Sequence, residues 1–120
     1  QDLLTLPLLH PDRRETWQEW FQAAGVEGAD VSRGPVMNRA AILIDAAING
    51  QGAALACTTL AAADLLSVRL IRPVEFSMPL SNSYWIVCPK AAAGMPKIKI
   101  FREWLMAEAA EDLRRLETAG

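Results

Sequence analysis

The sequence predicts an α/β fold in which a mostly parallel sheet is flanked by helices. Along the 120 residues, short apolar segments of strand length alternate with longer segments of helical periodicity. Apolar residues make up 52% of the chain and charged residues 22%, a balance typical of a chain that builds a compact core. No internal repeat or low-complexity linker interrupts this pattern, so we expect one α/β arrangement along the whole sequence.

The first strand and helix are the most clearly marked. Residues 7–10 form a short apolar stretch closed by Pro11, which is typical of a buried strand followed by a turn. Asp12 and Glu15 then stand three apart, as in a capping box that opens a helix. Gly25 is placed to end that helix. Between these ends, four apolar residues recur on one helix face and are expected in the core: Trp17, Trp20, Phe21 and Ala24.

A second strand and helix are expected around residues 31–49. Gly34-Pro35 indicates a turn into a short strand that ends near Met37. Asn38 is a suitable N-cap for a helix over residues 39–49, which the glycines of residues 50–52 would end.

The third strand is expected at residues 53–56, because this segment is short, apolar and bounded by turn residues. Thr58 or Thr59 can then cap a short helix that runs to Leu66.

Two more strands and a last helix complete the predicted order. Residues 69–76 alternate imperfectly and contain Pro73, which favours an edge strand or a bulge. Residues 84–88 are rich in aromatic and β-branched side chains and are expected to form a better strand. Pro96 suits the first turn of a long amphipathic helix, and residues 91–94 are the expected loop before it.

Composition excludes several classes of function. A net charge of −2 and a pI near 5.3 provide no basic patch for a phosphate backbone, so we expect no nucleic-acid binding by this chain alone. The longest apolar run is far shorter than the roughly 20 residues that cross a bilayer. Cys57 and Cys88 form no CxxC pair, and His10 lies far from both, so no metal, cofactor or disulfide is expected. Reduced thiols fit a cytoplasmic protein.

Catalytic motifs are absent from the sequence. There is no G-x-S-x-G elbow, no P-loop and no G-x-G-x-x-G before a helix. His10 with Asp12 is a conceivable base and orienting acid, although a histidine at a strand end more often caps a turn. Arg13 and Arg14 are expected to be ordinary solvated helix charges. We therefore expect a protein that is not an enzyme.

A binding site is expected at the carboxyl edge of the sheet, where ligands lie in open α/β sheets. Asn38 and Arg39 would place an amide and a guanidinium beside the positive end of a helix, which suits a carboxylate-bearing small molecule. Thr58 at the next strand end and Tyr84 at the mouth of a later strand are the other candidates. The alternative is that Asn38 only caps the helix and Arg39 is only a surface charge.

Two sets of residues carry a resemblance to a known family. The first set lies near the start of the chain: Leu8-Leu9-His10, Arg14, Trp17, Trp20 and Ala24-Gly25. The second set follows further along: Arg33-Gly34-Pro35, residues 46–55, Asp64-Leu65, residues 69–73, Tyr84-Trp85 and Phe101-x-x-Trp104-Leu105. In this order and spacing the sequence resembles the effector-binding domain of LysR-type transcription regulators, in the branch of the glycine-cleavage-operon activator.

This resemblance implies a fold similar to type 2 periplasmic binding proteins, with two subdomains that close on a small-molecule effector. Residues 1–82 would hold most of the second subdomain, and residues 83–120 a return strand and the C-terminal helix of the first. DNA would be bound only through a helix-turn-helix domain outside this chain, in a cytoplasmic homo-oligomer. Tyr84 resembles a tyrosine of the relatives that sense cell-wall peptides. Many relatives carry an acidic-and-serine run where this sequence has Asn38-Arg39, which leaves the effector class open.

Gln1 is not expected to be a natural start, so we expect this chain to be part of a longer protein whose remaining segments complete the cleft. The alternative function is an extracytoplasmic solute-binding protein of similar fold. A small α/β enzyme is the third reading, and it lacks a convincing nucleophile and base.

Overall fold

The computed structural model describes residues 2–80 and 83–119 of the chain. These residues form two compact units, Gln1–Met78 and Pro79–Gly120, each of which has its own internal contacts. The first unit opens with a short 3₁₀ helix, η1, at Asp2–Thr5 and contains all the β structure described below.

A small parallel sheet organises the first unit. Strand β1, Leu8–Leu9, pairs in parallel with strand β2, Ala53–Ala54, so that Leu8 is opposite Ala53. On the other side of β1, His10 forms a parallel bridge with Val36. The predicted strands at the start of the chain and after Gly52 are therefore present, although each is shorter than expected, and the strand predicted near Met37 is reduced to a single-residue bridge at Val36. The predicted parallel α/β arrangement is confirmed.

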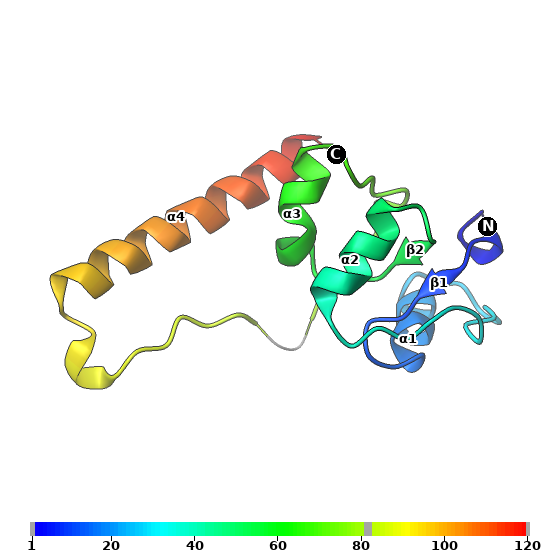
Figure 1. The fold of residues 1–120 in the computed structure, drawn as a ribbon, viewed down its shortest axis with the longest axis horizontal. Helices are drawn as coiled ribbons and strands as arrows, with labels where there is room; N and C mark the ends of the chain where they lie inside the picture. The colour runs from blue at the N-terminus through cyan, green and yellow to red at the C-terminus, as the bar shows by residue number, and fades with distance from the viewer. Residues whose placement is uncertain (1, 81–82, 120) are drawn as a thin grey trace. The chain divides into compact units, whose positions relative to one another are not determined.

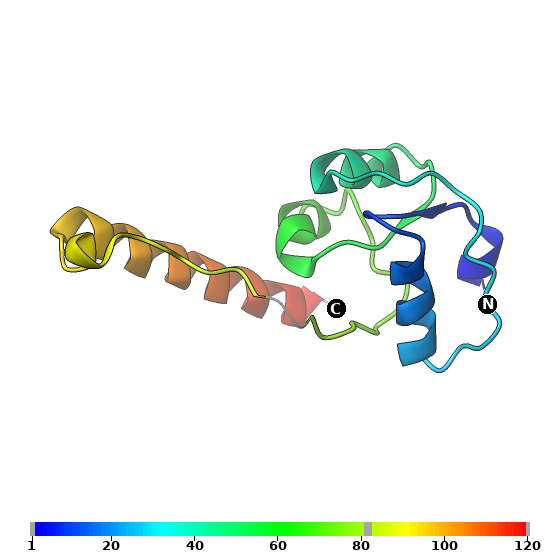
Figure 2. The ribbon, with the colours of Figure 1, turned by 90° about the horizontal axis from the view of Figure 1, so that it is seen from below.

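Two helices cover opposite faces of these strands (Figures 1 and 2). Helix α1 spans Glu15–Ala23 and helix α2 spans Ala40–Ile48. Successive residues of a strand point to opposite faces, and here Leu8 packs into the cluster of α1 while Leu9 packs into the cluster of α2. Two adjacent leucines of β1 therefore join two apolar layers.

The aromatic residues of α1 form the larger of these layers. Trp17, Trp20 and Phe21 are all buried, and their rings meet at centroid distances of 5.4–5.6 Å. The Trp17 indole Nε1 also donates a hydrogen bond to the Leu9 carbonyl oxygen at 2.9 Å. Phe76 closes the cluster with an edge-to-face contact on Trp20, at 5.4 Å. The prediction that these tryptophans belong to the core is confirmed.

The helix starts differ from the predicted capping residues. Helix α1 begins at Glu15 after Arg14, so Asp12 lies too early to cap it and instead accepts bonds from the Arg13 amide and the Thr16 hydroxyl. Helix α2 is preceded by Arg39, and helix α3, at Thr58–Leu66, by Cys57; neither residue makes a side-chain cap bond. The capping roles predicted for the Asp12–Glu15 pair, for Asn38 and for Thr58 or Thr59 are therefore wrong by one or more residues.

The helix ends follow one hydrogen-bond pattern. After α1, the Val26 amide bonds to the Phe21 carbonyl and the Gly25 amide to the Gln22 carbonyl, which is the Schellman motif. Gly25 and Gly50 supply the left-handed residue after α1 and α2, as predicted for helix stops. After α3 the same position is occupied by Val68, with φ at 59° and 75% of the residue exposed. A β-branched residue is strained in this conformation.

The two later strands are not formed. Residues 69–76 contain no strand, because Phe76 packs on Trp20 instead and the amides of Arg69 and Leu70 bond to the Asp64 carbonyl at the end of α3. In the second unit, residues 84–88 are extended and exposed, and no described residue of that unit provides a pairing strand. Both predictions were wrong, because β propensity describes one segment whereas a strand requires a neighbour's backbone.

The second unit is dominated by one long helix. A short 3₁₀ helix, η2, at Lys90–Ala92 leads into helix α4, Pro96–Ala119, so the predicted start at Pro96 is confirmed. Near its end, Glu111 accepts hydrogen bonds from Arg114 and Arg115. The bond from Arg114 is the largest cause, followed by the charge of Arg114 and then by the bond and charge of Arg115, and together they lower the pKa of Glu111 to about 2. Among the described residues, no helix combines the length and apolar character needed to span a bilayer.

Close packing requires a glycine at one position on each side of β1. A Cβ atom on Gly34, whose φ is +97°, would overlap the Leu8 carbonyl oxygen. A Cβ atom on Gly52 would overlap the Pro7 carbonyl oxygen in the same way. The neighbours of β1 can therefore approach it only where they lack a side chain.

Replacing Gly34 with alanine should lower the free energy of unfolding by about 2 to 4 kcal/mol, because left-handed strain adds to a steric overlap. Gly28→Ala is the matched control: its φ is +71°, but no atom lies within 4 Å of the new Cβ. It should cost about 1 kcal/mol from the backbone alone. Urea unfolding followed by tryptophan fluorescence measures both values. Equal losses in the two variants would contradict the packing argument.

Replacing Val68 with glycine should stabilise the first unit by about 1 kcal/mol, because glycine adopts the left-handed conformation without strain. The reverse change at the equivalent position of α1, Gly25→Val, should destabilise by a similar amount, since its Cβ meets no neighbouring atom. Thermal unfolding of the three proteins would show the opposite shifts. A fall in melting temperature for the Val68 variant would count against the assigned strain.

Candidate functional site

Three of the four predicted site residues follow the carboxyl ends of the parallel strands. Asn38 and Arg39 lie two and three residues after the bridge at Val36, and Thr58 lies four residues after the end of β2. Because parallel strands end at the same edge of a sheet, the fold brings all three residues to one edge. Asn38 and Arg39 are exposed, and Thr58 is half-buried.

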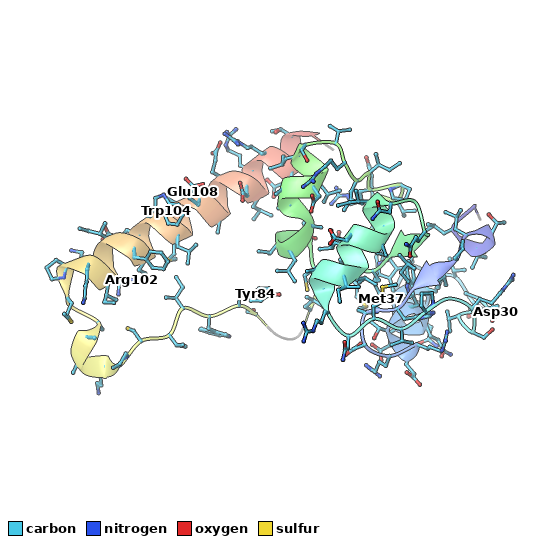
Figure 3. The ribbon with its side chains drawn as sticks, in the orientation of Figure 1. Asp30, Met37, Tyr84, Arg102, Trp104 and Glu108 are labelled. Carbon is cyan, nitrogen blue, oxygen red and sulfur yellow. The ribbon has the colours of Figure 1, made fainter. Side chains whose placement is uncertain are left out.

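The backbone before Asn38 is held firmly to the central strand. The Met37 amide donates to the His10 carbonyl at 2.8 Å, and the His10 amide donates to the Pro35 carbonyl at 3.0 Å. The Met37 side chain packs on the cluster of Leu9 and α2. Figure 3 shows Met37 beside the first turn of α2. The exposed Asn38-Arg39 pair therefore projects from a well-anchored backbone.

Two features of this edge favour negatively charged ligands. Helices α2 and α3 both begin at this edge, and neither has a side-chain cap. No capping side chain therefore occupies the first backbone amides of either helix, which can bond to another acceptor. The guanidinium of Arg39 adds a full charge, and within the described part of the chain it takes part in no salt bridge. Uncapped helix starts together with an arginine suit a carboxylate or another small anion.

Tyr84 lies in the second unit, on the extended segment before η2, and its side chain is exposed (Figure 3). The structure thus describes Tyr84 within a different unit from Asn38, Arg39 and Thr58. Its grouping with those three residues stays a prediction.

The loop that leads to this edge is held by two side chains from the β1–α1 connection. His10 is fully buried, and its Nε2 donates to the Arg33 carbonyl at 2.9 Å. Arg14 is half-buried, and its Nη1 donates to the Ser32 carbonyl at 2.7 Å. His10 therefore binds a loop carbonyl and does not pair with Asp12. The prediction that Arg14 is an ordinary solvated charge was wrong.

The loop also carries its own internal bonds. The Asp30 carboxylate accepts the Ser32 hydroxyl at 2.6 Å and the Ser32 amide at 3.0 Å. These two bonds, with the charge of Arg33 as a lesser cause, lower the pKa of Asp30. Sequence reasoning missed the roles of Arg14, Asp30 and Ser32. The two-residue spacing of Asp30 and Ser32, which is typical of an Asx turn, is the signal that could have found part of this arrangement.

Possible metal ligands do not gather in the described residues: no three His, Cys, Asp or Glu side chains lie together there. Cys57 and Cys88 are both free thiols. The described residues therefore show no cluster of three or more such side chains that could hold a metal ion.

Comparisons with known proteins agree on one family. A family model described as the LysR substrate binding domain matches residues 1–110. The glycine cleavage system transcriptional activator of Escherichia coli strain K12 is 34% identical over 112 residues, which cover 93% of this chain and 37% of that protein. The transcriptional activator AmpR of Pseudomonas aeruginosa is 35% identical over 114 residues, covering 94% of this chain and 38% of that protein.

A solved structure gives the same result. The effector domain of the regulator AmpR of Pseudomonas aeruginosa matches with a TM-score of 0.64 and 35% identity, covering 96% of this chain and 55% of that one. The chain therefore spans about a third of the length of these curated relatives and about half of the effector-domain structure. The resemblance predicted from the sequence is confirmed. The named relatives are transcription regulators rather than enzymes or solute-binding proteins.

Replacing Ser32 with alanine should raise the pKa of Asp30 towards its ordinary value of 3.8, because the hydroxyl bond is lost. In the wild type the folded pKa is the lower one, so this carboxylate's contribution to the loop is complete above 3.8 and is lost as the pH falls through the lowered pKa. Carbon NMR titration of the Asp30 carboxyl measures the shift, with Ser77→Ala as the control. An unchanged Asp30 pKa in the Ser32 variant would refute this account.

Proposed function

The chain belongs to the LysR substrate binding domain family, and we propose that it senses a small-molecule effector on behalf of a LysR-type transcription regulator. Its relatives are transcriptional activators, and the matching structure is an effector domain. The single observation that carries the proposal is that Arg39 and the uncapped starts of α2 and α3 lie at one carboxyl edge of the sheet, where they suit an anionic ligand.

The effector is proposed to be a carboxylate-bearing metabolite held at this edge. Arg39 would bind the carboxylate, supported by the free amides at the start of α2, while Asn38 and Thr58 would supply hydrogen bonds. Tyr84 is proposed to approach the same ligand from the second unit. A guanidinium without a salt bridge beside an uncapped helix start favours an anionic group over a neutral one.

The proposed mechanism is a shift between two subdomain arrangements. We propose that residues 1–82 belong to the second subdomain and that residues 83–120, which include helix α4, belong to the first. An effector that binds the closed arrangement more tightly shifts the equilibrium by no more than that difference in affinity. In the whole regulator, proposed to be a cytoplasmic homo-oligomer, this shift would move helix-turn-helix domains on DNA.

Ligand screening by NMR tests this proposal directly. Amino acids and small dicarboxylates are titrated into the labelled chain, each beside its neutral amide, and the backbone amides of residues 38–42 and of Thr58 are followed. We expect at least one carboxylate to shift these signals while its amide does not. NMR is suited to the weak binding expected if the chain holds only part of the cleft.

Replacing Arg39 with glutamine should weaken binding of that carboxylate about tenfold, because a charge-assisted bond is lost. Arg69→Gln is the control, since Arg69 pairs with Asp64 at the opposite end of α3 from Thr58. Carboxylate binding that is equal in both variants, or shifts that map elsewhere on the chain, would rule out this site.

A further inference from the structure

The exposed pair Asn38-Arg39 has no regular structure of its own. It lies between a single-residue bridge at Val36 and the first residue of α2, and Arg39 makes no cap bond. The position of these two side chains therefore depends on whatever fixes the backbone immediately before them. That backbone is residues 30–37, which cross from the α1 side of the sheet to its carboxyl edge.

Two neighbouring carbonyls in this segment are held from the β1–α1 connection. Arg14 donates to Ser32 at 2.7 Å and His10 donates to Arg33 at 2.9 Å. Because a carbonyl can only accept, the His10 Nε2 carries the hydrogen of this 2.9 Å bond, so the Arg14 Nη1, 3.3 Å from the same nitrogen, is a second donor and forms no hydrogen bond with it. The Nδ1 of the ring is then the acceptor nitrogen, and it has no hydrogen-bond partner among the described residues. Only one nitrogen of this buried ring is used, and it is the one aimed at the loop.

His10 contacts the segment with its backbone as well as its ring. Its amide bonds to the Pro35 carbonyl at 3.0 Å, and its carbonyl accepts the Met37 amide at 2.8 Å. The ring bond to Arg33 therefore adds a third fixed point two residues before Pro35. Between these points Gly34 lies directly against the backbone of Leu8. Three bonds from one residue leave the segment little freedom to slide along β1.

We infer that His10 and Arg14 are positioning residues that set the place of Asn38 and Arg39 by holding the carbonyls of Ser32 and Arg33. The relevance of this placement to an effector rests on the proposed function, whereas the placement itself does not. Neither side chain needs to touch the ligand, and His10 cannot, because it is fully buried.

The first test uses two substitutions of His10. His10→Leu removes the ring donor but keeps an apolar side chain in the buried space, whereas His10→Gln keeps an N–H that can reach Arg33. Hydrogen exchange is measured at the Met37 amide and, as an internal reference, at the Ala24 amide, which bonds to Trp20 at the end of α1. Nitrogen relaxation reports the order of Asn38 and Arg39.

In His10→Leu the Met37 amide should exchange about fivefold faster relative to Ala24, because a bond worth about 1 kcal/mol is lost from the segment alone. His10→Gln should restore most of the protection. Equal acceleration of both amides in the leucine variant would indicate a general loss of stability and overturn the inference. Failure of glutamine to restore protection would overturn it as well.

Arg14 provides a second and independent test, which also applies if the leucine variant does not fold. Arg14 is only half-buried, so Arg14→Met should fold and should increase the mobility of Asn38 and Arg39. Arg14→Lys keeps a donor and should restore order in part. Unchanged relaxation of both residues in Arg14→Met would remove Arg14 from the proposed role.

The same samples separate this inference from the proposed function. If the segment loosens in His10→Leu but no carboxylate shifts the wild-type signals, the proposed function fails and the positioning role stands. If a carboxylate binds wild type and His10→Leu equally well despite a mobile segment, positioning for binding is overturned and the proposed function stands.

Discussion

The first unit depends on the close approach of two backbone segments to a strand of only two residues. β1 is paired on one side by β2 and on the other by the bridge at Val36, and glycine occupies the crowded position on each side. Because Leu8 and Leu9 point to opposite faces, the same two residues also anchor the clusters of α1 and α2. A strand this short cannot be stable by itself. Its neighbours and both helix layers stabilise it together.

Features that a segment specifies locally were predictable from the sequence. The aromatic face of α1, the apolar strands and the glycine stops after α1 and α2 all follow from periodicity or from backbone conformation. The capping residues were misplaced because Asp12 and Asn38 each lie one or more positions before the residue where the packed helix begins. Residues 69–76 and 84–88 failed as strands because pairing depends on a partner that β propensity cannot supply.

In the candidate site, too, some features could be predicted from the sequence and others depend on distant partners. Topology alone places Asn38, Arg39 and Thr58 at one edge, since the ends of parallel strands coincide. The side-chain bonds that hold the loop carbonyls of Ser32 and Arg33 before that edge could not be predicted from topology. The partners of His10 and Arg14 lie 23 and 18 residues further along the chain and are backbone carbonyls, which leave no mark in the sequence. An arginine at a helix start gives the same pattern whether it is solvated or bonded to a distant loop.

Under the proposed function, the bonds from His10 and Arg14 to the loop carbonyls would favour binding at the candidate site. Fixing the backbone of one residue costs about 1–2 kcal/mol, so ordering Asn38 and Arg39 at the moment of binding would offset much of the attraction of a small anion. The bonds from His10 and Arg14 to the Arg33 and Ser32 carbonyls would order part of this backbone when the chain folds, before any ligand binds. Under the proposed function, the buried histidine would support affinity without contacting the ligand, because its bond to the Arg33 carbonyl orders the backbone before Asn38 and Arg39.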